Sequence, residues 1–246
     1  MANFSKWLGV GLGWTFGGPI GGVLGFVLGS FIDEFSQGEI IDFQRQAKTK
    51  STTSSGDFEI SLLVLAAIVI KTDGGIDRRE LEFVRTSFIS MYGKERANRA
   101  FKLFKGIIKD KNINTRQVCL QINKHMNHAS RLQLLHFLFN VAKADGSVTQ
   151  TEMNKIYTIS GYLNINVYDF NSIKAMFYNE ADSAYKILEI KKSANDDEVK
   201  KAYRKMVKKY HPDKIRGLGA EHLKGAEEKF RQVQNAYEQI QKERGI

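Results

Sequence analysis

The chain has 246 residues, a formal net charge of +10, 42% hydrophobic residues and two prolines. Its length suits one domain of ordinary size plus a smaller one, and its composition favours an all-α protein over a sheet protein. The single cysteine, Cys119, excludes an internal disulfide, whereas the positive charge fits an acidic partner, an anionic membrane or nucleic acid.

The first predicted element is a membrane anchor at residues 1–32. No charged residue occurs between Trp7 and Ile32, and a helix needs about 20 apolar residues to cross a bilayer. Glycines recur there at every fourth position, a stripe that lets a second helix approach closely and predicts a homodimer through this stripe. They are Gly9, Gly13, Gly17, Gly21, Gly25 and Gly29. A cleaved signal peptide and a re-entrant hairpin bent at Pro19 are the alternatives.

The basic residues that flank this anchor predict its orientation. Only Lys6 precedes it, whereas Arg45, Lys48 and Lys50 follow it. Because cytoplasmic flanks carry the excess of Lys and Arg, we expect the inner membrane, with the C-terminal bulk in the cytoplasm. Residues 33–56 are polar, end in "KTKSTTSSG" and form the predicted linker.

Residues 57–179 are expected to form a domain of consecutive amphipathic helices. Within it, "SLLVLAAIVI" is apolar on all sides but too short to span a bilayer, which predicts a buried central helix.

Two stretches of this domain resemble each other: "KTDGGIDRRELEFV" from Lys71 and "KADGSVTQTEMNKI" from Lys143. In each, Asp-Gly is expected to end one helix. Asp77 or Thr149 then caps the next helix, and the glutamate three residues later completes a capping box. Each stretch therefore predicts an elbow between two helices.

The same pattern also fits the second half of an EF-hand calcium loop. The first half fails, because Val69 and Lys71 stand where carboxylates are needed. A different divalent-ion site in the two elbows stays open as the alternative to simple capping, and its candidate ligands are Asp73, Glu80, Asp145 and Glu152.

The paired elbows in a helical domain of this size resemble the TerB-like domain associated with tellurite-resistance proteins, over roughly residues 57–179. The resemblance implies a helical scaffold and leaves its association with a metal open.

The last predicted domain covers residues 182–246. Asn195 and Glu198 predict the start of a basic helix, and Pro212 predicts its end at about Tyr210, because a residue before proline is pushed out of helical conformation. A later helix, "AEEKFRQVQNAYEQI", has a matching apolar face. We expect an antiparallel hairpin, closed by a small helix, with "HPD" at its exposed tip.

This arrangement resembles the J domain of DnaJ-type co-chaperones, in "YKIL" from Tyr185, "EVKKAYRK" from Glu198, "YHPDK" from Tyr210, "AEEKF" from Ala226 and "NAY" from Asn235. The resemblance implies that the tip engages a DnaK-type chaperone ATPase and that the basic helix docks on an acidic surface of that partner. The partner-binding residues that it implies are His211, Pro212, Asp213, Lys200, Tyr203, Arg204 and Lys205.

Glu189 departs from the family, which often has glycine after the first helix. The order of anchor, TerB-like domain and J domain resembles the DjlA type of membrane-anchored DnaJ-like proteins. We therefore expect a co-chaperone that is not an enzyme, needs no cofactor and stimulates ATP hydrolysis by a DnaK-type partner.

Four alternatives remain at this point. The first is a metal-associated TerB-like stress-response scaffold with a non-stimulatory J domain. The second is a zinc protein using His211, Asp213 and His222, although their spacing is irregular. The third is nucleic-acid binding by the basic helix, which its acidic first turn and the lack of interleaved exposed aromatic residues disfavour, so no nucleic-acid partner is expected. The fourth is that the tip residues are simply exposed loop residues.

Overall fold

The computed structural model describes residues 55–109, 113–178, 182–218 and 223–245. Throughout these segments the regular elements are helices and there is no strand, which confirms the all-α prediction. The predicted anchor at residues 1–32, its glycine stripe and nearly all of the 33–56 linker lie outside the described residues. None of the described helices is both long and apolar enough to cross a membrane.

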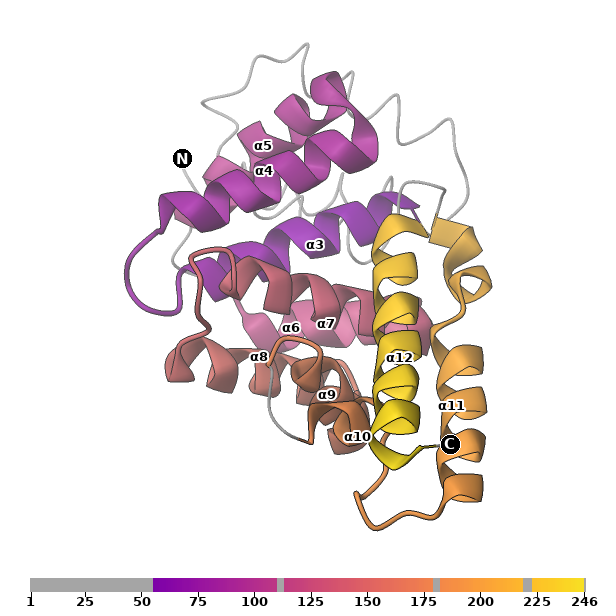
Figure 1. The fold of residues 1–246 in the computed structure, drawn as a ribbon. Helices are drawn as coiled ribbons and strands as arrows, with labels where there is room; N and C mark the ends of the chain where they lie inside the picture. The colour runs from indigo at the N-terminus through magenta and orange to yellow at the C-terminus, as the bar shows by residue number, and fades with distance from the viewer. Residues whose placement is uncertain (1–54, 110–112, 179–181, 219–222, 246) are drawn as a thin grey trace, which may run out of the picture. The chain divides into compact units, whose positions relative to one another are not determined.

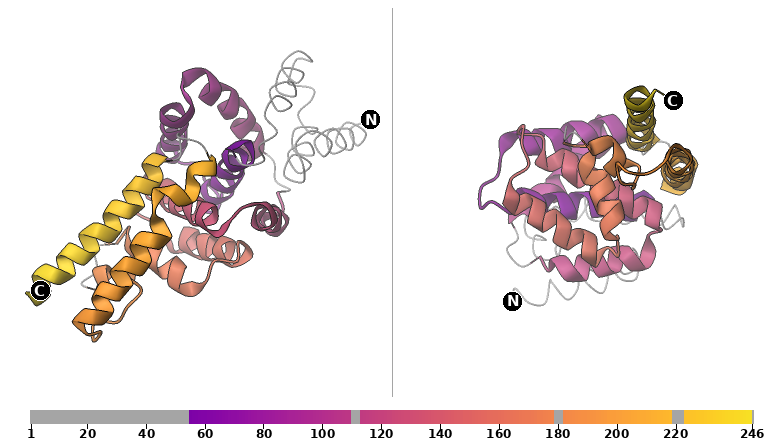
Figure 2. Two further views of the ribbon diagram at one scale, coloured as in Figure 1. Left: turned by 90° about the vertical axis from the view of Figure 1, so that its right-hand side faces the viewer. Right: turned by 60° about the horizontal axis from the view of Figure 1, so that its bottom comes forward.

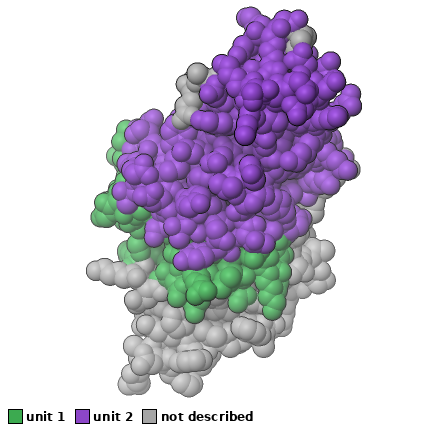
Figure 3. Space-filling model, turned by 90° about the horizontal axis from the view of Figure 1, so that it is seen from below, with its two compact units in different colours: residues 1–126 green, residues 127–246 purple. Residues whose placement is uncertain are grey.

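The chain divides into two compact units between Met126 and Asn127 (Figure 3). This division falls inside the segment 57–179, which we predicted to be one domain. The predicted domain boundaries therefore remain predictions, and each unit is described by itself.

The first unit contains four described helices, and three of them pack around the central one, α3 (Figure 1). They are α3 (Ser55–Ile70), α4 (Arg78–Tyr92), α5 (Lys94–Lys109) and α6 (Thr115–His125). Every side chain from Leu62 to Ile70 is at most 8% exposed, because α3 has no polar face to turn toward water. The prediction of a buried central helix is confirmed.

The second unit begins with three helices and continues into the hairpin. Its elements are α7 (His128–Ala142), α8 (Gln150–Tyr162), α9 (Val167–Ala175), α10 (Ser183–Ile187), α11 (Asp196–Tyr210), the 3-10 helix η2 (Pro212–Leu218) and α12 (Leu223–Arg244). Helix α7 is nearly all buried, and it contacts α8, α9, η2 and α12. The hairpin is thus packed on α7 rather than standing apart from it.

Both elbows form at the positions that the sequence predicts, and among the described contacts the predicted capping box is found at the second. Gly74 and Gly146 have φ angles of 78° and 114°, a left-handed conformation that glycine adopts without steric cost. At the second elbow, Thr149 and Glu152 form the predicted reciprocal capping box. At the first, Asp77 caps α4 by accepting the backbone N–H of Arg79 at 2.7 Å.

Helices α11 and α12 run antiparallel and side by side in all views (Figures 1 and 2), and α10 packs against α12. The predicted start and end of α11 are confirmed: Asn195 and Glu198 form a capping box, and the helix ends at Tyr210. The hairpin is held together by buried residues on the facing sides, including Val199 and Met206 on α11 and Val233 and Ile240 on α12.

Candidate functional site

The predicted tip lies at the C-terminal end of α11. His211 leaves the helix with a ψ angle of 132°, and Pro212 starts η2. The His211 carbonyl accepts the backbone N–H of Lys214 at 3.0 Å, and His211 Nδ1 accepts the backbone N–H of Asp213 at 3.3 Å. These two bonds fix the turn, so the side chains project from a defined backbone.

The tip offers its charged groups to solvent. The side chains of His211 and Asp213 are 47% and 52% exposed, and their closest N–O distance is 3.6 Å. The His211 ring lies edge-on to Phe230 of α12, with 6.0 Å between the ring centres. An exposed carboxylate on a fixed turn is suited to pairing with a cation on another protein.

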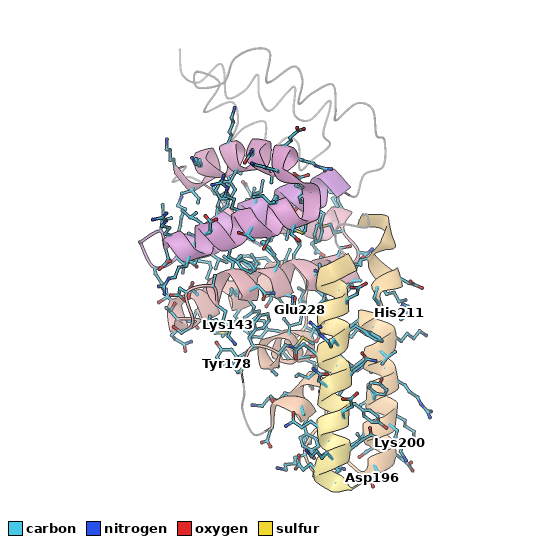
Figure 4. All side chains as sticks on the ribbon, turned by 45° about the horizontal axis from the view of Figure 1, so that its top comes forward. Lys143, Tyr178, Asp196, Lys200, His211 and Glu228 are labelled. Atoms are coloured by element: carbon cyan, nitrogen blue, oxygen red, sulfur yellow. The ribbon has the colours of Figure 1, made fainter. Side chains whose placement is uncertain are left out.

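The exposed face of α11 carries the predicted basic residues Lys200, Arg204 and Lys205. Figure 4 shows Lys200 and His211 toward opposite ends of the helix. At a rise of about 1.5 Å per residue they are separated by about 16 Å, so the site is an extended strip and not a pocket.

Tyr203 differs from its neighbours in this strip. Its ring is half-buried and stacks on Tyr237 of α12, with 4.1 Å between centres and 9° between planes. The structure therefore shows Tyr203 joining the two helices of the hairpin, and any contact with a partner would use the remaining edge of the ring.

Two acidic residues beside this strip, Asp169 and Glu189, were not predicted from the sequence as part of the site. Glu189 is 5% exposed, and its carboxylate pairs with both Lys205 and Lys209. Lys209 pairs in addition with Asp169 of α9. We call these four side chains, Asp169, Glu189, Lys205 and Lys209, the carboxylate clamp.

Glu189 reaches this position through an unusual backbone conformation. Its φ angle is 59°, and it follows α10 in a Schellman motif: its own N–H bonds to Lys186 O and the N–H of Ile190 bonds to Tyr185 O, each at 3.0 Å. Glycine is the usual residue there, because a side chain in this conformation costs about 1 kcal/mol. The sequence did give one sign of this feature, because Glu189 stands where the J-domain family often has glycine.

Asp169 is 1% exposed and is held by α9 itself. Asn166 caps α9 by accepting the Asp169 backbone N–H, and its amide donates to Asp169 Oδ2 at 2.8 Å. His128 Nε2 lies 2.9 Å from the same oxygen. Burial opposes ionisation, but the hydrogen bonds from His128 and Lys209 outweigh it and lower the pKa of Asp169 to about 2. The carboxylate is therefore charged at neutral pH.

An open cleft of about 560 Å³ adjoins the clamp. Besides the clamp residues it is lined by His128, Asn166, Tyr168, Lys208 and Lys214. Cationic groups outnumber carboxylates there, so the cleft extends the basic strip toward α9.

The candidate metal ligands are not gathered into a site. Across the described segments no group of three or more His, Cys, Asp or Glu side chains is arranged to hold a metal ion. Glu152 is engaged in the capping box, where its Oε2 accepts the Thr149 backbone N–H at 2.8 Å. The proposed ligation by Asp73, Glu80, Asp145 and Glu152 stays a prediction without support from this geometry.

Comparisons with known protein families assign three consecutive segments. A family model described as the co-chaperone DjlA transmembrane domain matches residues 1–51, one described as tellurite resistance protein TerB matches 59–175, and the DnaJ domain model matches 183–245. The TerB match extends across the division between the two units.

Individual proteins resemble the chain over different lengths. Co-chaperone protein DjlA of Coxiella burnetii is 29% identical over 243 residues, covering 86% of this chain and 88% of that protein. Co-chaperone protein DjlA of Vibrio cholerae is 49% identical over 65 residues, covering 26% of this chain and 23% of that protein. Chaperone protein DnaJ of Lactiplantibacillus plantarum is 54% identical over 56 residues, covering 23% of this chain and 13% of that protein. No solved structure matches the chain.

Proposed function

Because the chain belongs to the DjlA type of DnaJ-like co-chaperones, we propose that its J domain binds a DnaK-type chaperone and stimulates the ATP hydrolysis of that partner. One observation carries the proposal: the exposed His211-Pro212-Asp213 turn continues directly from the exposed basic strip of α11. The two features form one surface that a single acidic partner can cover.

Each part of this surface has a distinct role in the proposal. Lys200, Arg204 and Lys205 attract and orient an acidic surface of the chaperone, because complementary charges raise the rate of productive encounter. Asp213 pairs with a cation of the chaperone, and Pro212 fixes the turn that holds it. Binding should therefore weaken severalfold as the salt concentration rises from about 0.05 to 0.3 M.

We place this activity at the cytoplasmic face of the inner membrane. The support is the match of residues 1–51 to the DjlA transmembrane domain and the excess of basic residues after the anchor. Recovery of the full chain in the soluble fraction without detergent would contradict the anchor. Loss of chemical crosslinking between copies after Gly17→Leu would support the dimer through the glycine stripe.

The test of the proposed function is steady-state ATP hydrolysis by a DnaK-type chaperone mixed with the full chain in detergent. We expect stimulation that disappears in His211→Gln and persists in His125→Gln, which makes the same substitution in α6 of the other unit. Absence of stimulation by the unchanged chain would contradict the proposal and favour the alternative, a TerB-like stress-response scaffold whose J domain does not stimulate a chaperone.

A further inference from the structure

The carboxylate clamp joins the J-domain match to the end of the TerB match. Lys205 and Lys209 lie one helical turn apart on α11, Glu189 follows α10, and Asp169 belongs to α9. Glu189 pairs with both lysines, and Asp169 pairs with Lys209. Two nearly buried carboxylates thus face one end of the basic strip, as an acidic surface of a partner would.

Further contacts hold the J domain to α9 and to α7. Ser172 Oγ of α9 donates to the carbonyl oxygen of Ile187 at 2.8 Å. Gly225, near the start of α12, packs on Gln133 of α7: a Cβ at this position would lie 2.1 Å from Gln133 Nε2, so the end of that side chain would have to shift. The J domain is therefore docked on α7 and α9 through contacts at three separate places.

The docked surface also buries groups that favour water. Lys229 of α12 is 3% exposed, and burial lowers its pKa to about 7. Burial, and then the charge of Lys229, lowers the pKa of His136 on α7 well below its usual value. Burying a lysine weakens an interface relative to an apolar one, which suits a contact that opens and closes.

We propose that α9 forms an autoinhibitory docking surface for the J domain, in which Asp169 of α9 and the J domain's own Glu189 neutralise Lys209 and Lys205 and so compete with the acidic surface of the chaperone. The inference rests on the proposed function, because Lys205 belongs to the partner-binding strip. Lys205 is 67% exposed, so the carboxylates of a partner can reach it and contend with Glu189 for the same ammonium group. Binding of the chaperone and docking on α9 then oppose each other.

The conformation of Glu189 supports a specific role for its carboxylate. A glycine would satisfy the Schellman turn without strain, yet the turn carries a side chain whose two oxygens each contact a lysine. A side chain kept in a disfavoured conformation indicates that its contacts outweigh the strain.

The experiment compares the affinity of a DnaK-type chaperone for the full chain in detergent and for three variants at low salt. Glu189→Gln keeps the size of the side chain but removes its charge, and Asp169→Asn does the same on α9. Glu243→Gln is the matched control, because Glu243 pairs with Lys192 at 3.2 Å away from the clamp. We expect each clamp variant to bind about fivefold more tightly than the unchanged chain, with the control unchanged.

A second measurement needs no chaperone. Reductive methylation of lysines in the full chain, followed by mass spectrometry, reports how freely each amine reacts. We expect Lys209, which is 18% exposed, to react faster in both clamp variants than in the unchanged chain and in Glu243→Gln. Equal rates would overturn the docked contact itself.

The outcomes separate this inference from the proposed function. Equal or weaker chaperone binding by both folded clamp variants would overturn the autoinhibition. Failure of the unchanged chain and of every variant to bind would overturn the proposed function and the autoinhibition together, while the methylation rates would still report on the docking. Binding that appears only in the clamp variants would support both proposals.

Discussion

The guanidinium group of Arg244 lies 5.2 Å from the ring centre of Tyr185 and donates from Nε to its hydroxyl at 3.1 Å. It also donates to the carbonyl oxygens of Ala194 and Lys192 at 2.6 and 2.7 Å, and to Asp196 at 3.1 Å. The last turn of α12 is thereby tied to α10, to the following loop and to the start of α11. A single side chain closes the end of the hairpin opposite the His-Pro-Asp turn.

Replacing Arg244 by lysine should loosen this end of the hairpin. Lysine keeps the charge but cannot reproduce the planar fork that contacts several acceptors at once. We expect faster hydrogen exchange of the backbone amides of α10 and a lower melting temperature. Arg231→Lys, on an exposed position of the same helix, should leave both unchanged; equal exchange in the two variants would contradict this role of Arg244.

Lys229→Met should stabilise the packing of α12, because it replaces a buried amine by an apolar side chain of similar length. The pKa of Lys229 is lowered from 10.5 to about 7, so folding is penalised fully below about pH 7 and the penalty fades as the pH rises toward 10.5. The gain should be on the order of 2 kcal/mol at pH 7 and should shrink by pH 10. Hydrogen exchange of α12 measures it, and a gain that does not change with pH would show that the buried charge is not its source.

Asp169 should make the second unit sensitive to acid. Its folded pKa of about 2 lies below its ordinary value of 3.8, so its contribution to stability is complete above about pH 4 and is lost as the pH falls toward 2. This contribution is on the order of 2 kcal/mol. Asp169→Asn should remove that part of the acid dependence when unfolding is followed in urea between pH 5 and pH 2. An identical pH dependence in the variant would contradict the assignment.

Thr149→Ala tests whether the second elbow is a capping structure or a metal site. Loss of the capping box should destabilise α8 by about 1 kcal/mol, measured by hydrogen exchange of its amides. Adding EDTA to the unchanged chain should leave that exchange unaltered. Faster exchange on chelation would instead support metal binding at the elbows.

Most local structure was predictable because it depends on neighbours in the sequence. The caps at Asp77, Thr149 and Asn195 follow from polar residues at fixed offsets from the helices that they start. The end of α11 follows from Pro212, and the buried α3 follows from a run of apolar residues. The position of the His-Pro-Asp turn at the hairpin tip was likewise predictable from matching apolar faces.

The clamp was not predictable, because it joins residues that are distant in the sequence. Asp169 and Lys209 are brought together by the packing of the hairpin on α7 and α9, which no local pattern encodes. The Asn166 to Asp169 spacing indicates only a helix cap. Glu189 stood out as a departure from the family, but its bonds to Lys205 and Lys209 depend on where α11 passes.

The contacts that join the J domain to α7 and α9, Gly225 on Gln133 among them, affect how such chains can exchange domains in evolution. The sequence families meet between residues 175 and 183, yet the packed body extends across that junction from Asn127 onward. A J domain exchanged from another protein would fold as a hairpin but would meet α7 and α9 with the wrong shape and charge. Recombination at this junction is therefore constrained, and the J domain and the helices that carry it are expected to change together.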